Sequence, residues 1–247
     1  GVADRESLSI AFMLPGLGDH YPGMARGLYE QSSGFRRRLD RCATLLEPEL
    51  EQDLREVLFA ERGDQDAPAS PAMDMRTMLG RSPASDGDQD DPLNRISLAH
   101  TSIFSVEYAV AGVWGDWGVS PGAFLGFSLG EIVGATLAGV MSLREGLTLV
   151  ARRARAIETL PRGAMLAVPL SVEDLGEHLD GGLSLAVQCA PRIQVVGGAS
   201  EEIAGLEARL ADRDIVSRRL QSDYAFHTGA MAGQERTVRD LVAGFDL

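Results

Sequence analysis

Residues 126–131 read Gly126-Phe127-Ser128-Leu129-Gly130-Glu131 and directly follow the short apolar run Ala123-Phe124-Leu125. A helix-like pattern comes next, so this stretch predicts a strand, a sharp turn and a helix. In that arrangement the glycines relieve crowding around an exposed serine hydroxyl, and the helix N-terminus favours negative charge. Ser128 is therefore a candidate nucleophile, although two glycines around a serine are too common to identify one by themselves.

A nucleophilic serine needs a base, and the histidines that could supply it are His20, His100, His178 and His227. His178 lies in a polar helical stretch and is expected to be solvated. His227 follows the apolar and aromatic segment Tyr224-Ala225-Phe226. That position suits a packed core histidine as well as a catalytic base, so the segment alone leaves both interpretations open.

Arg153 lies in the segment Ala151-Arg152-Arg153-Ala154-Arg155, on a predicted helix that begins after the nucleophile turn. Successive helix residues are offset by about 100 degrees, so one of the three arginines can face inward while Arg152 and Arg155 face water. An inward guanidinium would bind a carboxylate through two parallel hydrogen bonds.

The N-terminal half of the sequence predicts one strand and several helices. The apolar run 8–14 ends at Pro15-Gly16 and is expected to be a buried strand. Helical patterns extend from about Met24 to Phe59, and a solvated, acidic loop is expected between about Glu61 and Pro92.

Two further helices are expected around the nucleophile turn. One should bury a stripe of apolar residues spaced by three and four: Ile103, Val106, Val110, Val113 and Trp117. The other is expected to begin at Ser142, because Ser142 and Glu145 have the spacing of a capping box.

The breaker Pro161-Arg162-Gly163 separates this region from a pattern of strand, helix, strand, strand, helix and strand that extends to about Leu220. A βαββαβ order is typical of a small ferredoxin-like subdomain. Its second helix has Ser200 as the expected N-cap.

Composition limits the class of protein. The chain has 247 residues, 45% of them hydrophobic, and a formal charge of −13, which fits a globular protein and argues against binding to nucleic acid. No apolar stretch approaches the ~20 residues of a membrane span and no signal peptide is visible, so a cytoplasmic protein without a membrane partner is expected. Cys42 and Cys189 suggest neither a disulfide nor a zinc site.

Taken together, these segments resemble the acyltransferase domains of modular polyketide synthases and, more distantly, the malonyl transferases of fatty-acid synthesis. The resemblance spans nearly the whole chain. It is carried in order by Phe12–Gly18 with Tyr21–Met24, Gly126–Glu131, Arg153 and Tyr224–His227.

The fold that this resemblance implies is α/β, with an inserted subdomain. An α/β-hydrolase-like large subdomain with a parallel sheet is expected over residues 1–160 and 222–247, and a ferredoxin-like small subdomain over 161–221. Members of the family normally continue well beyond the position of Leu247, so the C-terminal part of the domain is expected to be missing.

The resemblance also implies a two-step transfer. A carboxyacyl group would move from coenzyme A to Ser128, and then to the phosphopantetheine thiol of an acyl carrier protein, beside an adjacent ketosynthase domain. No metal or bound cofactor is expected. The implied roles are His227 as base, the backbone N–H groups of Leu17 and Leu129 as oxyanion donors, and Arg153, Phe226, Tyr224 and His100 as substrate-binding residues. Leu17 stands where the family usually has glutamine, and His100 about where a glutamine often precedes the long helix.

Malonyl-CoA is the expected donor, because the Phe226 ring leaves little room for a branch at C2. Tyr224 is typical of methylmalonyl-selecting relatives, so the segment is a hybrid. Three alternatives stay open: an acyl hydrolase that clears stalled carrier proteins, a catalytically degenerate docking domain of a synthase, and an unrelated α/β hydrolase. Arg153, which the resemblance implies binds a carboxylate, argues against the acyl hydrolase that clears stalled carrier proteins.

Overall fold

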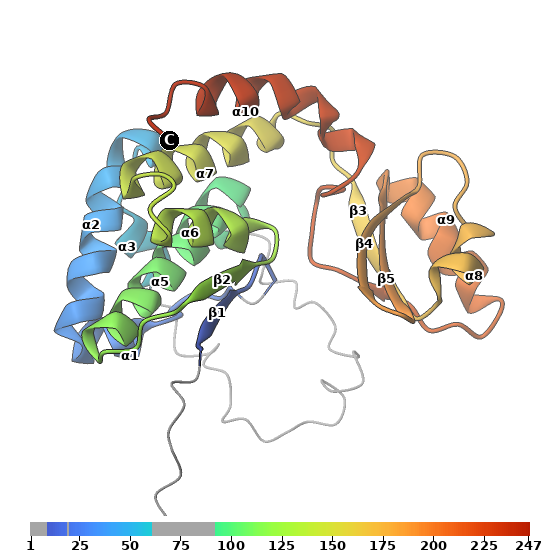
Figure 1. Cartoon of the computed structure of the whole chain (residues 1–247). Helices are drawn as coiled ribbons and strands as arrows, with labels where there is room; N and C mark the ends of the chain where they lie inside the picture. The colour runs from blue at the N-terminus through green and yellow to red at the C-terminus, as the bar shows by residue number, and fades with distance from the viewer. Residues whose placement is uncertain (1–8, 19, 61–91) are drawn as a thin grey trace, which may run out of the picture. The chain divides into compact units, whose positions relative to one another are not determined.

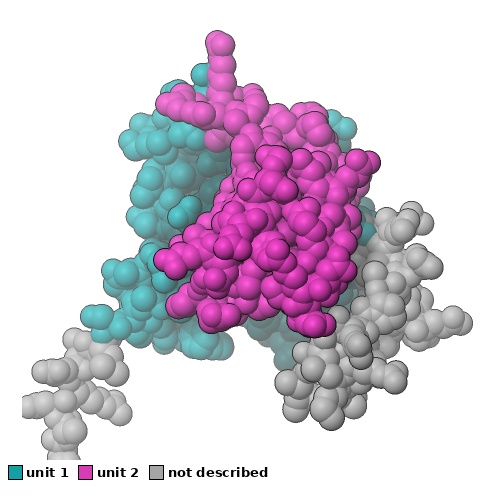
Figure 2. Space-filling model, turned by 90° about the vertical axis from the view of Figure 1, so that its right-hand side faces the viewer, with its two compact units in different colours: residues 1–72, 83–155, 240–247 teal, residues 73–82, 156–239 magenta. Residues whose placement is uncertain are grey.

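A computed structural model of the chain describes residues 9–18, 20–60 and 92–247 (Figure 1). The acidic loop expected between Glu61 and Pro92 lies almost entirely outside the described residues. The described residues form two compact units, each with its own hydrophobic core (Figure 2). Unit 1 contains residues up to 60, 92–155 and 240–247, and unit 2 contains 156–239. The subdomain boundaries expected from the sequence stay a prediction.

Unit 1 combines a pair of parallel strands with helices (Figure 1). The strands are in register from Ala11 opposite Ala123 to Leu14 opposite Gly126. The first strand therefore begins at Ala11, later than the apolar run suggested. The expected burial is correct for Leu14 but wrong for Met13, which is 77% exposed because successive strand residues face opposite sides. The elements are β1 (Ala11–Leu14), α1 (Arg26–Gln31), α2 (Ser33–Leu50), α3 (Leu54–Leu58), the 3₁₀ helix η2 (Pro92–Asn94), α5 (Ile96–Asp116), β2 (Ala123–Gly126), α6 (Leu129–Leu137) and α7 (Leu143–Glu158).

Helix α5 is the central helix of unit 1 and contacts α2, α3 and α6. Because it has neighbours on several sides, every residue from Ile96 to Ser105 is buried, including polar ones. The predicted apolar stripe is correct for Ile103 and Val113 but wrong for Trp117, which is 70% exposed. The helix ends at Asp116, so Trp117 lies past the packed face, edge-on to another exposed tryptophan.

By length and composition, α5 could also cross a membrane, which the sequence analysis did not anticipate. Within the described part of the chain it is the one helix of this kind, and 61% of its most apolar window is buried inside the protein. That burial is what the core helix of a globular domain shows.

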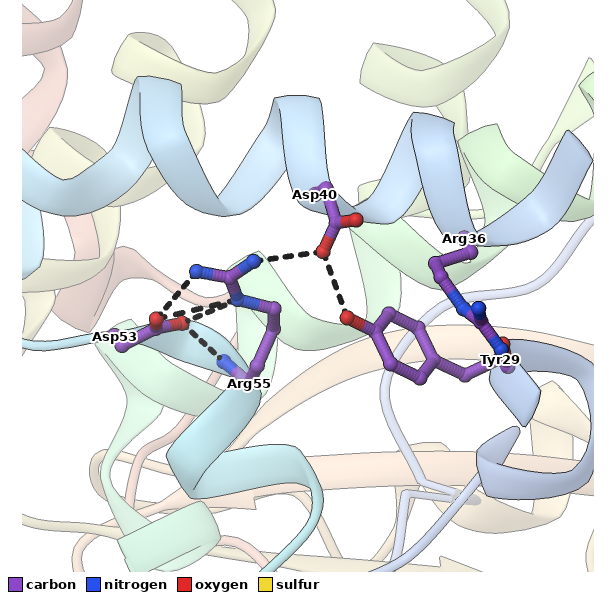
Figure 3. A network of polar contacts seen from close by, with 5 residues as sticks. All are labelled: Tyr29, Arg36, Asp40, Asp53 and Arg55. Atoms are coloured by element: carbon purple, nitrogen blue, oxygen red, sulfur yellow. Dashed lines mark hydrogen bonds and ion pairs between the residues drawn. The ribbon is translucent and has the colours of Figure 1, made fainter. Parts of the chain in front are cut away.

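A polar network joins the first three helices of unit 1 (Figure 3). The Tyr29 hydroxyl on α1 donates to the Asp40 carboxylate on α2 at 2.8 Å, and the Arg55 guanidinium on α3 donates to the same oxygen at 2.7 Å. Arg55 also pairs with Asp53 at 2.6 Å, and the Arg36 guanidinium lies 5.3 Å from the centre of the Tyr29 ring. The network fixes these helices relative to one another.

The capping box expected at the start of α7 is confirmed. The Ser142 N–H donates to the Glu145 carboxylate at 2.8 Å, and the Glu145 N–H donates to the Ser142 hydroxyl at 3.2 Å. The buried face of α7, which includes Leu147, Val150 and Ala154, sets the direction in which its arginines point.

Unit 2 confirms the expected βαββαβ order. Its antiparallel strands lie in the order β4-β5-β3-β6, and Leu166, Val196 and Leu206 are fully buried between this sheet and its helices. The elements are β3 (Ala164–Val168), α8 (Val172–Gly176), β4 (Ser184–Ala190), β5 (Ile193–Gly198), α9 (Ser200–Ala211), β6 (Arg218–Arg219), the 3₁₀ helix η3 (Gly229–Gln234) and α10 (Glu235–Val242), which continues into unit 1.

Two local expectations for unit 2 are wrong. His178 is buried rather than solvated, because it follows the short α8 and its ring nitrogen lies 3.4 Å from the Arg213 guanidinium. Ser200 is the first residue of α9 rather than its N-cap, which is Ala199. The Ala199 N–H donates to the Glu202 carboxylate at 3.2 Å, so an acidic side chain of the first turn binds the N–H of the N-cap.

Candidate functional site

The serine turn has the predicted strand–turn–helix geometry. Ser128 joins β2 to α6 with a positive φ of 54°. The Phe127 N–H donates to the Leu14 carbonyl at 2.9 Å, which fastens the turn to the end of β1. A Cβ on Gly130 would lie 2.1 Å from that carbonyl oxygen, and one on Gly126 would lie 2.3 Å from the backbone of α6. Both glycines are therefore required by packing around the turn.

The loop after β1 lies against this turn. A Cβ on Gly16 would lie 3.0 Å from the Phe127 carbonyl oxygen and 3.4 Å from the Ser128 Cβ. Leu17 follows in this loop and packs against the core, while the buried Leu129 is the first residue of α6. The loop and the helix start are thus neighbours of Ser128, and their N–H groups as oxyanion donors stay a prediction.

Unit 1 also contains a cluster of His20, His100 and Arg153. His100 is 1% exposed, and burial lowers its pKa to about 3, followed by the charges of Arg153 and His20. Burial also lowers the pKa of Arg153 on α7 from its ordinary value. His100 lies inside α5, whereas the sequence suggested a place before the long helix. Because the His100 imidazole is neutral, the pair of His100 and Arg153 carries one positive charge rather than two. Both side chains can still hydrogen-bond an anion.

Arg153 differs from the neighbouring arginine of its helix. Arg152 is exposed and pairs with Glu49 at 2.9 Å, as a solvated arginine is expected to do. Arg153 is half-buried, and no carboxylate within the described residues lies at ion-pair distance from it. A half-buried guanidinium without a protein counter-charge is suited to an anionic ligand.

The segment expected to carry the base lies in unit 2. His227 is exposed and has a left-handed backbone, with φ of 58°. Tyr224 is buried, and its hydroxyl donates to the Glu158 carbonyl at 3.4 Å. The half-buried Phe226 ring lies 6.3 Å from the Tyr224 ring. The two rings therefore lie in the segment that directly precedes His227, and their role in substrate binding stays a prediction.

The expected residues are thus distributed over both units. Ser128, its loop and the Arg153 cluster belong to unit 1, whereas Tyr224, Phe226 and His227 belong to unit 2. The pairing of Ser128 with His227 therefore stays a prediction. Within the described ranges, no three His, Cys, Asp or Glu side chains gather closely enough to hold a metal ion.

His20 was expected only as one of four candidate bases and not as a neighbour of His100. Its charge acts on His100, which places it in the same cluster. The one signal in the sequence was its position just after the loop Gly16-Leu17-Gly18, and only the folded chain shows that His20 acts on His100 of α5.

These features define a class. A serine on a nucleophile-type turn in an α/β unit is the arrangement of enzymes that form an acyl-serine, and in this chain a ferredoxin-like unit follows it. Residues 11–243 match the model of the acyl transferase domain family, and the chain belongs to that family.

Named relatives agree with this assignment. One of them, a phenolphthiocerol/phthiocerol polyketide synthase protein of Mycobacterium tuberculosis, is 34% identical over 222 residues, which are 90% of this chain and 13% of that protein. Polyketide synthase GfsA of Streptomyces halstedii is 32% identical over 238 residues, 95% of this chain and 3% of that protein. The chain therefore spans a small part of the length of these relatives.

Solved structures confirm the fold. The acyl transferase domain of SpnD, in complex with 2-(pent-4-yn-1-yl)malonyl, has a TM-score of 0.79 and 32% identity, covering 97% of this chain and 51% of that one. Malonyl CoA-acyl carrier protein transacylase from Clostridium perfringens has a TM-score of 0.74 at 17% identity, covering 96% and 68%. The α/β architecture expected from the sequence is thereby confirmed.

Proposed function

We propose that this chain transfers a malonyl-type acyl group from coenzyme A to the phosphopantetheine thiol of an acyl carrier protein within a polyketide synthase. Ser128 is the nucleophile and forms an acyl-serine intermediate. The observation that carries the proposal is the Arg153 and His100 cluster in the same unit as the serine turn. An uncharged acyl group would leave this half-buried guanidinium without a counter-charge.

The first step of the proposed reaction loads Ser128. His227 takes the hydroxyl proton while the oxygen attacks the thioester carbonyl, and the coenzyme A thiolate leaves with a proton from the same imidazole. The N–H groups of Leu17 and Leu129 hold the oxyanion, and losing one such donor typically costs about 3 kcal/mol of barrier.

The second step repeats this chemistry with a different nucleophile. The carrier-protein thiol gives its proton to His227 and attacks the acyl-serine, and the Ser128 oxygen leaves with that proton. No metal ion or bound cofactor takes part in the proposed steps. Arg153 holds the carboxylate of the acyl group during both the loading step and the transfer step. This contact orients the acyl carbonyl toward each nucleophile.

Relatives support the substrate and partners of this proposal. The SpnD domain has been solved with a substituted malonyl group, and the curated relatives are polyketide synthases. An acyl carrier protein and an adjacent ketosynthase domain are therefore the proposed partners. The Phe226 ring beside His227 favours an unbranched malonyl group over methylmalonyl.

A second candidate keeps the serine chemistry but uses water as the acceptor, which would make the domain an acyl hydrolase. The half-buried guanidinium of Arg153 favours the transferase, because a hydrolase of non-carboxylated thioesters has no use for it. The degenerate docking domain is disfavoured by the intact serine turn, whose two glycines keep their close backbone contacts.

Competition among malonyl-, methylmalonyl- and acetyl-CoA tests the proposal in the full-length polypeptide. Wild type should load malonyl at least ~100-fold faster than acetyl, and Arg153→Ala should abolish most of this preference. The matched control is Arg152→Ala, one position away on the exposed face of α7. Equal loading of acetyl and malonyl by wild type would contradict the carboxylate site, and hydrolysis of acyl-carrier thioesters unaffected by Arg153→Ala would favour the hydrolase.

A further inference from the structure

The segment that carries His227 is held against the sheet of unit 2 by close backbone contacts. The Gly163 N–H, just before β3, donates to the Asp223 carbonyl at 2.8 Å. A Cβ on Gly163 would lie 3.1 Å from both the Cβ and the backbone nitrogen of Ala225, and 2.7 Å from the Gly198 carbonyl oxygen. The backbone at Ala225 therefore lies closer to Gly163 than a side chain at position 163 would allow.

A second glycine provides a similar contact at the other end of the segment. Gly197 on β5 lies opposite Met165 of β3, and its neighbour Val196 packs into the core of unit 2. Because successive residues of a strand point to opposite faces, Gly197 faces away from that core. A Cβ there would lie 2.8 Å from the Thr228 methyl group, Cγ2, and 3.4 Å from the Ala225 Cβ.

Thr228 links this contact to the conformation of the histidine. Its hydroxyl donates to the Ala225 carbonyl at 2.7 Å and accepts from the Ala230 N–H at 3.2 Å. These two bonds connect the backbone before His227 with the backbone after it. The left-handed φ of 58° at His227 is uncommon for a residue with a side chain. Such a backbone persists when the surrounding contacts fix it, and Thr228 supplies two of them.

We propose that Gly197 is a positioning residue for His227. Its missing side chain lets the Thr228 methyl group lie against β5, and the Thr228 hydroxyl then holds His227 in its left-handed conformation. The role of His227 as the base rests on the proposed function, whereas its placement by Gly197 and Thr228 rests on contacts within unit 2. The sheet of unit 2 thus positions the imidazole.

The test compares the effect of Gly197→Ala in two backgrounds of the full-length polypeptide, wild type and Thr228→Ser. Gly197→Ala should lower kcat for malonyl transfer at least ~10-fold, with KM for malonyl-CoA within about twofold, because the carboxylate-binding residues lie in unit 1. In a Thr228→Ser background the obstructing methyl group is gone and the hydroxyl remains, so the same change should cost less than about threefold. The control is Gly205→Ala on α9, where the nearest atom to a new Cβ is the tip of Arg209 at 3.6 Å.

A second readout separates positioning from catalysis. Modification of His227 by diethyl pyrocarbonate, followed by peptide mass spectrometry across pH, should change in rate in Gly197→Ala and return in the double variant. If His227→Gln retains full activity, the base assignment fails, and the modification data still decide the placement. Equal loss of kcat in both backgrounds, or unchanged kcat and modification in Gly197→Ala, would overturn the proposal.

A third variant covers the case in which Gly197→Ala does not yield folded protein. Thr228→Val keeps the shape of the side chain and removes the hydroxyl that bonds Ala225 and Ala230. Its kcat should also fall at least ~10-fold, with a changed rate of His227 modification. A kcat equal to that of wild type would overturn the role of Thr228.

Discussion

The guanidinium of Arg153 acts on the buried imidazole of His100, although the two residues lie on different helices of unit 1. Burial is the larger cause of the low pKa of His100, about 3, and the charge of Arg153 is the second. His100 is therefore neutral at physiological pH. It can donate or accept a hydrogen bond beside Arg153 without adding repulsion.

This relationship predicts acid sensitivity. The pKa of His100 is about 3 in the folded protein against 6.5 ordinarily, so the unfolded chain binds a proton first as pH falls. Stability is fully present above about pH 6.5 and is lost progressively down to about pH 3, by on the order of 3 kcal/mol at pH 4. Urea unfolding at about pH 7 and about pH 4.5 should show a smaller acid-induced loss in His100→Gln than in wild type. An identical loss in both proteins would contradict the assignment.

Glu107 on α5 predicts the opposite pH dependence. Its carboxylate oxygens are buried, without a hydrogen-bond partner in the described part of the chain, and burial raises its pKa from 4.5 to about 8. Stability is fully present below about pH 4.5 and falls as pH rises towards about 8. Glu107→Gln should therefore raise the Tm at about pH 8 and change it little at about pH 4. The exposed Glu47→Gln on α2 is the control, and an equal rise at both pH values would contradict the prediction.

The serine turn predicts a sharp difference between two glycines. Gly130→Ala places a methyl group 2.1 Å from the Leu14 carbonyl oxygen, which is backbone and cannot move without displacing β1. The free energy of unfolding should fall by more than about 2 kcal/mol. Gly115→Ala on α5, where a new Cβ meets nothing within 4 Å, should be neutral or slightly stabilising. Equal denaturation midpoints for the two variants would contradict the packing argument.

Phe226 predicts the size of the accepted acyl group. Phe226→Ser removes the ring that lies beside His227 and packs with Tyr224. One methyl group is worth about 1–3 kcal/mol in a pocket, so the ratio of methylmalonyl to malonyl loading should rise by about 10-fold. Competition between the two donors, read by mass spectrometry of the loaded polypeptide, gives this ratio. A ratio unchanged from wild type would show that the ring does not limit the branch.

Local patterns predicted the elements of this fold well. The serine turn and the capping box at Ser142 depend on residues close in sequence, so composition and spacing were sufficient. The βαββαβ order of unit 2 followed from alternation and helical spacing for the same reason.

Tertiary packing explains what local patterns could not predict. His178 is buried against Arg213, which lies 35 residues further along the chain, and Trp117 is exposed because α5 ends one residue before it. The cluster of His20, His100 and Arg153 joins three segments far apart in sequence, so spacing could not reveal it. The resemblance assigned His100 and Arg153 to substrate binding, and only the folded chain places His20 in the same cluster.

The most direct measurement is the site of acylation. The full-length polypeptide is incubated with malonyl-CoA without a carrier protein, digested, and analysed by peptide mass spectrometry. A malonyl group should be found on Ser128 and should disappear in Ser128→Ala. A malonyl group on another residue, or one that persists in Ser128→Ala, would contradict the acyl-serine mechanism.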